Sequence, residues 1–291
     1  MLTHMGEARW SLIVHGGART IEPSQEAANR QGCLRAAEAG AAILRSGGSA
    51  LQAAEHAVRM LEDDTTFNAG SGSVPTLDGT VEMDAAMMDG GTLEVGAVAA
   101  IRRVRNPVSV ARLLLQEGTV LLVGEGANAF ADEKNIPRAH VPSAIRSGRQ
   151  HDTVGCVAFD AHGQIAAATS TGGLSGQRAG RVGDAPIPGC GFYADSHAGG
   201  VAISGDGESI MRILLAGRVM EQLKVSSPQA AAALALRHMD RVGGEAGIIA
   251  LNEQGSFGLA HNSDHFAVGL AASWLPAPRS GVHQSDFEDL I

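Results

Sequence analysis

The spacing of apolar and polar positions along the chain predicts both helices and strands. Apolar residues fall at helical spacing over 26–45 and over 50–61, and Ser49 is a suitable N-cap for the second segment. Further helices are predicted at 107–117, 125–133, 208–223 and 228–241. Short runs of small or β-branched residues predict strands at 10–14, 80–89, 93–100, 120–123, 247–252, 258–261 and 265–272, with another beginning at 199. We expect the polar stretch 276–291 to form a mobile tail.

Two apolar runs around a glycine-containing turn predict a hairpin in the middle of the chain. Thr153 opens the first run, and Thr171 lies just past the end of the second. In an antiparallel pair, the start of one strand lies beside the end of the other. The pattern therefore predicts that Thr153 and Thr171 are neighbours.

Thr153 has two interpretations. A threonine hydroxyl is a weak nucleophile unless a base accompanies it, and an N-terminal threonine can use its own α-amine, with a reference pKa of about 7.7–8.0. That chemistry requires cleavage of the Asp152–Thr153 bond, because Thr153 lies within the chain. The alternative is an ordinary threonine that begins a strand, and the hairpin alone leaves both open.

Composition narrows the class of protein. Hydrophobic residues make up 44% of the 291 residues but aromatic residues only 3%, with 38 glycines, so we expect a core of small side chains and closely packed backbones. The net charge is −9 without a basic cluster, which argues against nucleic acid and anionic membranes as partners. Three cysteines without a CxxC pair, and no signal peptide or membrane-spanning run, indicate a cytoplasmic protein.

Several polar groups invite other chemistry. The glycine-rich loop at 62–72 lacks the lysine of a phosphate-binding loop, so nucleotide binding is not expected. Asp84 and Asp89 lie an odd number of residues apart on one strand, which favours structural roles over an acid–base pair. His261 and His265 fit strand alternation better than a metal pair. His15-Gly16-Gly17 interrupts the first strand as either a turn or a close approach to a site.

Three strings in this order and spacing resemble the asparaginase-2 family of N-terminal-nucleophile hydrolases, which includes plant-type L-asparaginases, isoaspartyl peptidases and glycosylasparaginases. They are residues 151–155 (HDTVG), 169–173 (TSTGG) and 180–186 (GRVGDAP). The resemblance implies an α+β fold, a four-layer αββα sandwich, over a single domain of 1–291. It also implies self-cleavage into an α chain of 1–152 and a β chain of 153–291. The proline- and glycine-containing segment 135–152 is then the linker.

The resemblance assigns roles to individual residues. Thr153 would be the nucleophile, oriented by Thr171, with Asn68 near the scissile bond and Ser204 and Gly205 as oxyanion donors. The family generally has threonine at the position of Ser204, and serine keeps the hydroxyl while losing the methyl group that restricts its rotamer.

Arg181 and Asp184 suit a substrate that carries a carboxylate and an ammonium group. By sequence alone they are equally well explained as a mutual surface ion pair, whereas the family uses the matching positions to hold the aspartyl moiety. By the same resemblance, Gly205 and the backbone of Gly207 contact the substrate.

The loop after the second helix would hold a structural sodium ion in the family, largely through backbone carbonyls. The matching residues here are Leu61, Glu62, Asp64, Phe67, Ala69 and Ser71. The proposed chemistry requires no organic cofactor.

The resemblance implies hydrolysis of β-aspartyl (isoaspartyl) dipeptides and L-asparagine, which are small-molecule or dipeptide substrates, by an (αβ)2 assembly. Residues 151–153 and 205–212 lean toward glycosylasparaginase instead, whereas 15–17, 67–70 and 124–127 lean toward the isoaspartyl-peptidase branch. Two alternatives of other kinds are an uncleaved, non-catalytic protein that binds aspartyl ligands and a threonine protease that acts on whole proteins. The narrow ion clamp argues against the protease, because an internal peptide bond offers no free α-amino and α-carboxylate pair.

Overall fold

The computed structural model describes residues 9–139, 141 and 152–291, and within them the strands form two sheets. The larger has eight strands in the order β12-β11-β1-β5-β6-β2-β3-β4, and the smaller has four in the order β10-β9-β8-β7. The strands of the larger sheet are β1 (Ser11–Arg19), β2 (Met83–Asp89), β3 (Val95–Ile101), β4 (Leu121–Val123), β5 (Thr153–Phe159), β6 (Ile165–Thr171), β11 (His265–Ala272) and β12 (Arg279–Gly281). Those of the smaller sheet are β7 (Phe192–Asp195), β8 (Gly199–Gly205), β9 (Ala246–Asn252) and β10 (Phe257–His261).

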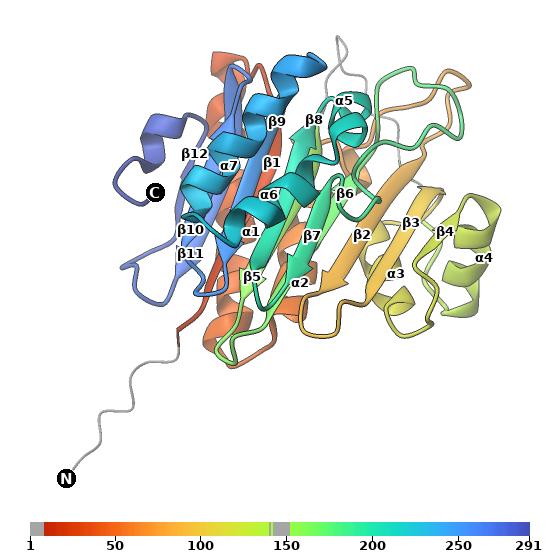
Figure 1. Ribbon diagram of the computed structural model, residues 1–291. Coiled ribbons are helices and arrows are strands. Elements are labelled where there is room, and N and C mark those ends of the chain that lie inside the picture. Colours follow the sequence, from red (N-terminus) through yellow and green to blue (C-terminus); the bar gives the residue numbers. More distant parts are fainter. Residues whose placement is uncertain (1–8, 140, 142–151) are drawn as a thin grey trace.

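Helices cover the outer face of each sheet, so the molecule has four layers (Figure 1). The larger sheet packs against α1 (Pro23–Arg45), α2 (Ala50–Glu62) and α3 (Pro107–Leu114), with α4 (Glu125–Glu133) beside β3 and β4. The smaller sheet packs against α6 (Leu215–Leu223) and α7 (Pro228–Leu236), and α5 (Gly207–Ile213) follows β8. The predicted αββα sandwich is confirmed.

Strands β5 and β8 of the two sheets approach closely because small residues face one another there. A Cβ atom added to Gly155 on β5 would lie 2.9 Å from the Cβ of Ala202 on β8. One added to Gly200 on β8 would lie 2.6 Å from the side chain of Val157 on β5. The expected close approach of backbones is confirmed where β8 packs directly against β5, whereas the rest of the core between the sheets also contains large side chains such as Phe192 and Phe266.

The central hairpin forms as predicted. β5 and β6 pair antiparallel in continuous register from Thr153↔Thr171 to Phe159↔Ile165. β1 lies on the other side of β5, and β2 lies on the other side of β6. Thr153 and Thr171 are thus directly opposed at one end of the larger sheet.

Several predicted elements differ from the structure, among them the helix predicted at 228–241, whose α-helical part ends at Leu236 before a 3₁₀ turn. Strand β1 does not stop at His15 but runs on to Arg19, with a register shift between His15 and Gly17 that lets the backbone continue along β11. The single helix predicted over 208–223 is two helices, since Leu214 adopts a left-handed φ of 53° between α5 and α6. The helix predicted at 107–117 ends at Leu114.

The C-terminal stretch is not the mobile tail that its polarity predicts. It forms strand β12 and a 3₁₀ turn at Gln284–Phe287. Val282 and Phe287 are 0% and 1% exposed, so two apolar side chains anchor the segment in the core. The prediction was wrong because a few buried residues suffice to dock a segment whose average composition is polar.

Most of the predicted linker at 135–152 lies outside the described residues, because residues 140 and 142–151 are not described. Its first part is attached to the fold through Arg138, which donates hydrogen bonds to the carbonyls of Arg102 and Asn128. Arg138 also pairs with Asp132. In the described part of the chain, no helix is both long and apolar enough to cross a membrane.

Candidate active site

The bond between Asp152 and Thr153 lies where β5 begins, opposite the end of β6. The hydroxyl of Thr171 donates a hydrogen bond to the carbonyl oxygen of Asp152 at 3.1 Å, and the backbone N–H of Gly173 donates to the same hydroxyl at 3.1 Å. The carbonyl that precedes Thr153 therefore already faces a hydrogen-bond donor. Such a contact polarises a carbonyl toward nucleophilic attack.

Ser204 lies on the nitrogen side of the same bond. Its hydroxyl oxygen accepts hydrogen bonds from the backbone N–H groups of Thr153 at 3.2 Å and Ala18 at 3.1 Å. The neighbouring Gly205 has a φ of +149°, and a Cβ atom there would lie 2.1 Å from the carbonyl oxygen of Glu245. In the intact chain the side chain of Ser204 thus contacts the nitrogen of Thr153, and its role as an oxyanion donor stays a prediction.

His15 lies beside this bond but is a poor base. Its ring is fully buried on β1, and burial lowers its pKa to about 3, an effect that the Thr153 backbone only partly offsets. The ring is therefore neutral near pH 7, and its affinity for a proton is low. Of the two interpretations of the His-Gly-Gly string, the close approach to a site is the one that the structure supports.

Asn68 holds the loop that follows Thr171. Its side-chain amide donates to the carbonyl of Gly173 at 2.7 Å and accepts from the N–H of Val74 at 3.1 Å. Its backbone carbonyl accepts from Gly172 at 2.8 Å. These contacts place Asn68 next to Thr171, where it fixes the loop through both ends of its side chain.

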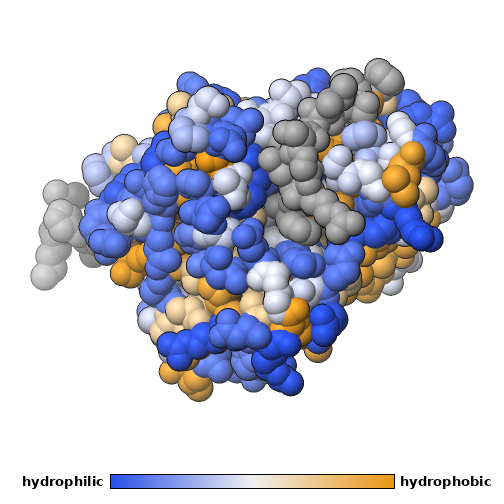
Figure 2. All heavy atoms as spheres, turned by 90° about the horizontal axis from the view of Figure 1, so that it is seen from above, coloured by the Kyte–Doolittle hydropathy of each residue, from blue (hydrophilic) through white to orange (hydrophobic). Residues whose placement is uncertain are grey.

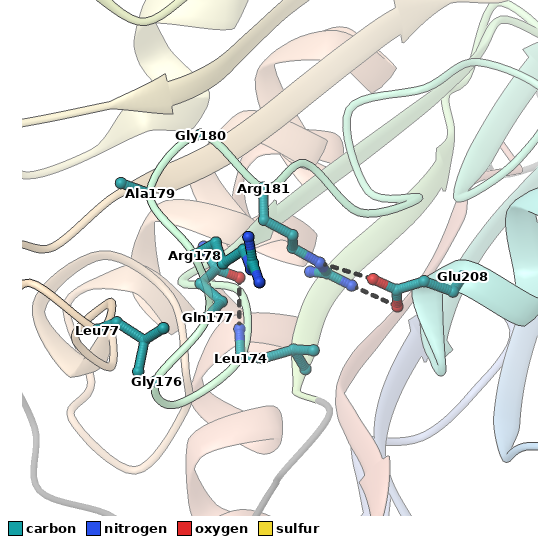
Figure 3. A pocket seen from close by; sticks show the side chains of 9 residues that line it. All are labelled: Leu77, Leu174, Gly176, Gln177, Arg178, Ala179, Gly180, Arg181 and Glu208. Carbon is teal, nitrogen blue, oxygen red and sulfur yellow. Dashed lines mark hydrogen bonds and ion pairs between the residues drawn. The ribbon is translucent and has the colours of Figure 1, made fainter.

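Arg181 lines a pocket of about 530 Å³ and points across it toward Glu208 (Figure 3). Two hydrogen bonds, of 3.0 and 2.7 Å, join the guanidinium group to the Glu208 carboxylate. The suggested mutual pair of Arg181 with Asp184 is therefore not what the structure contains. Arg181 presents its fork to a carboxylate, the geometry expected of a carboxylate-binding arginine. The other lining residues are Leu77, Leu174, Gly176, Gln177, Arg178, Ala179 and Gly180.

Asp184 is a buried carboxylate that can still accept a hydrogen bond. Its Oδ2 atom has no hydrogen-bond partner among the described residues, and burial raises its pKa to about 7. A Cβ atom added to Gly207 would lie 2.8 Å from Oδ1 of Asp184 and 3.1 Å from Nη2 of Arg181. The three predicted clamp residues thus meet at one point, and glycine at 207 keeps that point open.

Sequence reasoning missed two acidic residues near this clamp. Asp84 stands opposite Thr171 in the sheet and accepts from the N–H of Ala100 at 2.8 Å. Burial raises its pKa to about 6, against the opposing charge of Arg181. Glu208 is the other residue. The sequence singled out Asp84 only as a structural residue and did not single out Glu208, because strand pairing and a distant loop bring them to the site. Asp89 instead caps a turn through the N–H of Gly91, so the two aspartates do not form an acid–base pair.

The loop after α2 contains backbone carbonyl oxygens of the kind expected to bind a sodium ion, and the ion itself stays a prediction. Cβ atoms added to Gly70 and Gly72 would lie 2.4 Å from the carbonyl oxygen of Glu62 and 2.0 Å from that of Phe67, so the carbonyls crowd the turn. The Asp64 carboxylate is occupied by the N–H of Thr66 and by Arg35. Backbone oxygens suit a hard cation, so these residues fit the expected ion.

A second group of residues has ligand-like spacing but a less favourable protonation pattern. Ligand atoms of Glu26, His265 and His283 lie within 4.8 Å of one another. Nδ1 of His265 accepts a hydrogen bond from the N–H of Ile21, which places the proton of the neutral ring on Nε2. His265 is then a donor rather than a metal ligand in this arrangement. His261 contacts the carbonyl of Ser263, so the two histidines do not form a pair.

The end of the molecule seen in Figure 2 is mostly hydrophilic, with scattered hydrophobic residues.

Comparison with known proteins identifies the family. A model of the asparaginase family, described as Asparaginase, matches residues 8–145 and 140–274. The chain belongs to this asparaginase family.

Relatives within the asparaginase family match the chain over most of its length. The chain is 42% identical to the isoaspartyl peptidase/L-asparaginase of Xenopus laevis, over 84% of this chain and 87% of that protein. It is 40% identical to the protein of the same name from Danio rerio, over 94% and 93%. It is 35% identical to the isoaspartyl peptidase of Salmonella typhimurium, over 94% and 98%. The family match over residues 140–274 includes both the hairpin and the clamp.

Proposed function

We propose that this protein is a threonine hydrolase that cleaves itself between Asp152 and Thr153 and then releases L-aspartate from β-aspartyl dipeptides and L-asparagine. The contact that carries the proposal is the hydrogen bond from Thr171 to the carbonyl of Asp152, directly opposite Thr153. The names of the relatives support the substrate class, since they are isoaspartyl peptidases and L-asparaginases.

Self-cleavage would proceed by an N-to-O acyl shift. The Thr153 hydroxyl attacks the Asp152 carbonyl carbon, the C–N bond breaks, and the nitrogen takes the hydroxyl proton to become an amine. Thr171 donates to the oxygen that gains charge, while Ser204 contacts the departing nitrogen. Water then hydrolyses the ester, which yields chains 1–152 and 153–291 and frees the α-amine of Thr153.

The mature site would use the new amine as its base. The amine takes the proton of the Thr153 hydroxyl as the oxygen attacks the side-chain carbonyl of the substrate. The leaving amine accepts that proton, and a β-aspartyl ester remains on Thr153 until water releases aspartate. The low pKa of His15 favours this assignment, because the imidazole beside Thr153 binds a proton poorly.

The clamp explains why small substrates fit. Arg181 would bind the α-carboxylate of the aspartyl moiety, and the unpaired Oδ2 of Asp184 would accept from its α-ammonium group. An ordinary residue within a protein lacks both groups, and an internal isoaspartyl residue lacks the free ammonium group, so whole proteins are poor substrates. The clamp fits β-aspartyl dipeptides and asparagine equally well.

A sodium ion, when bound, would supply positive charge that gathers the backbone carbonyls of the loop 61–71. The residues that would hold it are Leu61, Glu62, Asp64, Phe67, Ala69 and Ser71. The same loop carries Asn68, which contacts the segment after Thr171. We further propose an (αβ)2 assembly in the cytoplasm, a location that the three free, buried cysteines support.

The test is the intact mass of denatured protein beside that of Thr153→Ala. We expect two chains that divide between Asp152 and Thr153 in the wild type and a single chain in the variant, which also fails to hydrolyse β-aspartyl dipeptides. Parallel assays with asparagine and with glycosylated asparagine rank the leaving groups. A wild-type chain that stays whole and inactive after long incubation would overturn the proposal and favour an aspartyl-binding protein.

A further inference from the structure

The residue before the proposed cleavage point carries a buried charge. The Oδ1 atom of Asp152 lies 2.7 Å from Nε of Arg19, and the two side chains are 0% and 6% exposed. They meet as an ion pair rather than through a well-aligned hydrogen bond. A charge buried this deeply requires a partner of opposite sign, so the pair is part of the fold.

The backbone of β1 is shaped around this carboxylate. Gly17 has a φ of +116°, and a Cβ atom there would lie 2.5 Å from Oδ1 of Asp152. The register shift between His15 and Gly17 occurs at the same place, where β1 stops pairing with β5 but continues along β11. The end of β1 therefore forms a seat for the side chain of Asp152.

Arg19 is itself held in place. Its guanidinium group donates to Asn29 Oδ1 on α1 at 3.4 Å and to the carbonyl of Thr20 at 3.3 Å. Its backbone pairs with His265 on β11. On the other side of the bond, Thr153 is fixed by its pairing with Thr171 and by Ser204. The end of β1 thus holds Asp152, and the ends of β6 and β8 hold Thr153, so the two residues joined by the scissile bond are fixed by separate parts of the fold.

We propose that Arg19 is a positioning residue for self-cleavage, which it serves by holding the Asp152 side chain. This inference rests on the proposed function. The ion pair fixes the Cα atom of Asp152, so that its carbonyl carbon faces the Thr153 hydroxyl and its oxygen faces Thr171. Arg19 exchanges no proton and makes no bond to the reacting atoms. After hydrolysis, its charge also offsets part of the second carboxylate that Asp152 gains as a chain end.

The experiment follows the conversion of the precursor into two chains by intact mass, over time after cell-free synthesis. Arg19→Met should slow cleavage about 10- to 100-fold, the size of effect that misplaced reacting groups produce. Arg19→Lys keeps the charge beside Asp152 and should cleave within a few-fold of the wild type. Arg30→Met is the matched control, because it breaks the partly exposed pair of Arg30 with Asp286 and should leave the rate unchanged.

A purely structural role is separated by the double variant Arg19→Met/Asp152→Asn. Removing both charges removes the unpaired buried charge, so the thermal midpoint, measured with Thr153→Ala added, should recover toward that of Thr153→Ala alone. We expect the double variant to cleave at least tenfold more slowly than the wild type. Recovery of the cleavage rate together with stability would overturn the inference, as would a wild-type rate in Arg19→Met. If the wild type itself never cleaves, the proposed function fails instead.

Discussion

At the scale of the residue, the protonation state of Asp184 should control substrate affinity. Burial raises its pKa to about 7, so this carboxylate is mostly neutral below pH 7 and mostly charged above it. Only the charged form attracts the substrate ammonium group. We therefore expect KM for a β-aspartyl dipeptide to rise about tenfold between pH 8 and pH 6, since each pH unit below the pKa removes most of the remaining ionised form.

The measurement is KM and kcat at pH 6, 7 and 8. The Thr153 amine also titrates in this range, but its protonation acts on the chemical step and thus on kcat. A KM that stays flat across the three pH values while kcat falls would contradict the assignment of Asp184 to the clamp.

Single residues also mark the limit of what the sequence predicts. Thr153, Thr171, Arg181 and Asp184 fall in compact strings with a resemblance to a family, so their proximity to one another was predictable. Glu208 contacts Arg181 from another element, 27 residues away, and Arg19 reaches Asp152 only because β1 runs beyond the glycines. Contacts of this kind depend on tertiary packing, which residue spacing does not encode.

At the scale of the element, Glu62 ties α2 to two neighbours. Its Oε1 atom accepts from the Ser170 hydroxyl on β6 at 2.7 Å and from the N–H of Val108 at the start of α3 at 3.0 Å. Burial raises its pKa from 4.5 to about 8. Between these two values the unfolded chain releases the proton while the folded chain keeps it. This group therefore lowers the stability of the fold as pH rises from about 4.5 to 8, by up to about 1.4 kcal/mol per pH unit.

Glu62→Gln should remove that pH dependence, because the amide keeps an acceptor oxygen and cannot ionise. In the Thr153→Ala background, which we expect to remain one chain, the variant should be more stable than its parent at pH 8 and similar at pH 5. Denaturant unfolding at the two pH values measures this. Glu55→Gln is the control, since Glu55 lies on the same helix and accepts from Ser109 at a partly exposed position. Equal pH dependence in parent and Glu62→Gln would show that Glu62 does not carry it.

Helices and strands were predictable wherever the apolar residues of a segment repeat with one clear helical or strand period. Helix α4 has the predicted bounds, and Ser49 caps α2 with a reciprocal bond to Gln52, a motif typically worth about 1 kcal/mol. The break at Leu214 was not predictable, because the residues on both sides have helical periodicity and leucine rarely adopts a left-handed φ. Tertiary contacts of the two shorter helices decide it.

At the scale of the whole molecule, the C-terminal segment should contribute to stability. Phe287 is 1% exposed and belongs to the core between the sheets, beside residues of β11 and β10. Phe287→Ala should cost about 3–5 kcal/mol, the usual range for removing a buried phenylalanine side chain. Thermal or denaturant unfolding in the Thr153→Ala background measures the loss. Val225→Ala is the control and should change stability little, because Val225 is 81% exposed. If Phe287→Ala lowers stability no more than Val225→Ala does, the C-terminal segment is a loose tail after all.

The strand order of the larger sheet has a consequence for the molecule after the proposed cut. β1 belongs to the piece 1–152 but lies between β11 and β5, which belong to the piece 153–291. The two pieces then share the larger sheet, and neither can leave without breaking three ladders of backbone hydrogen bonds, those of β1 with β11, β1 with β5 and β2 with β6. Dilution does not dissociate such a pair, because neither piece is a folded unit that could be released. A solution diluted a thousandfold would hold the same joined molecules, and affinity capture of either piece would bring the other with it.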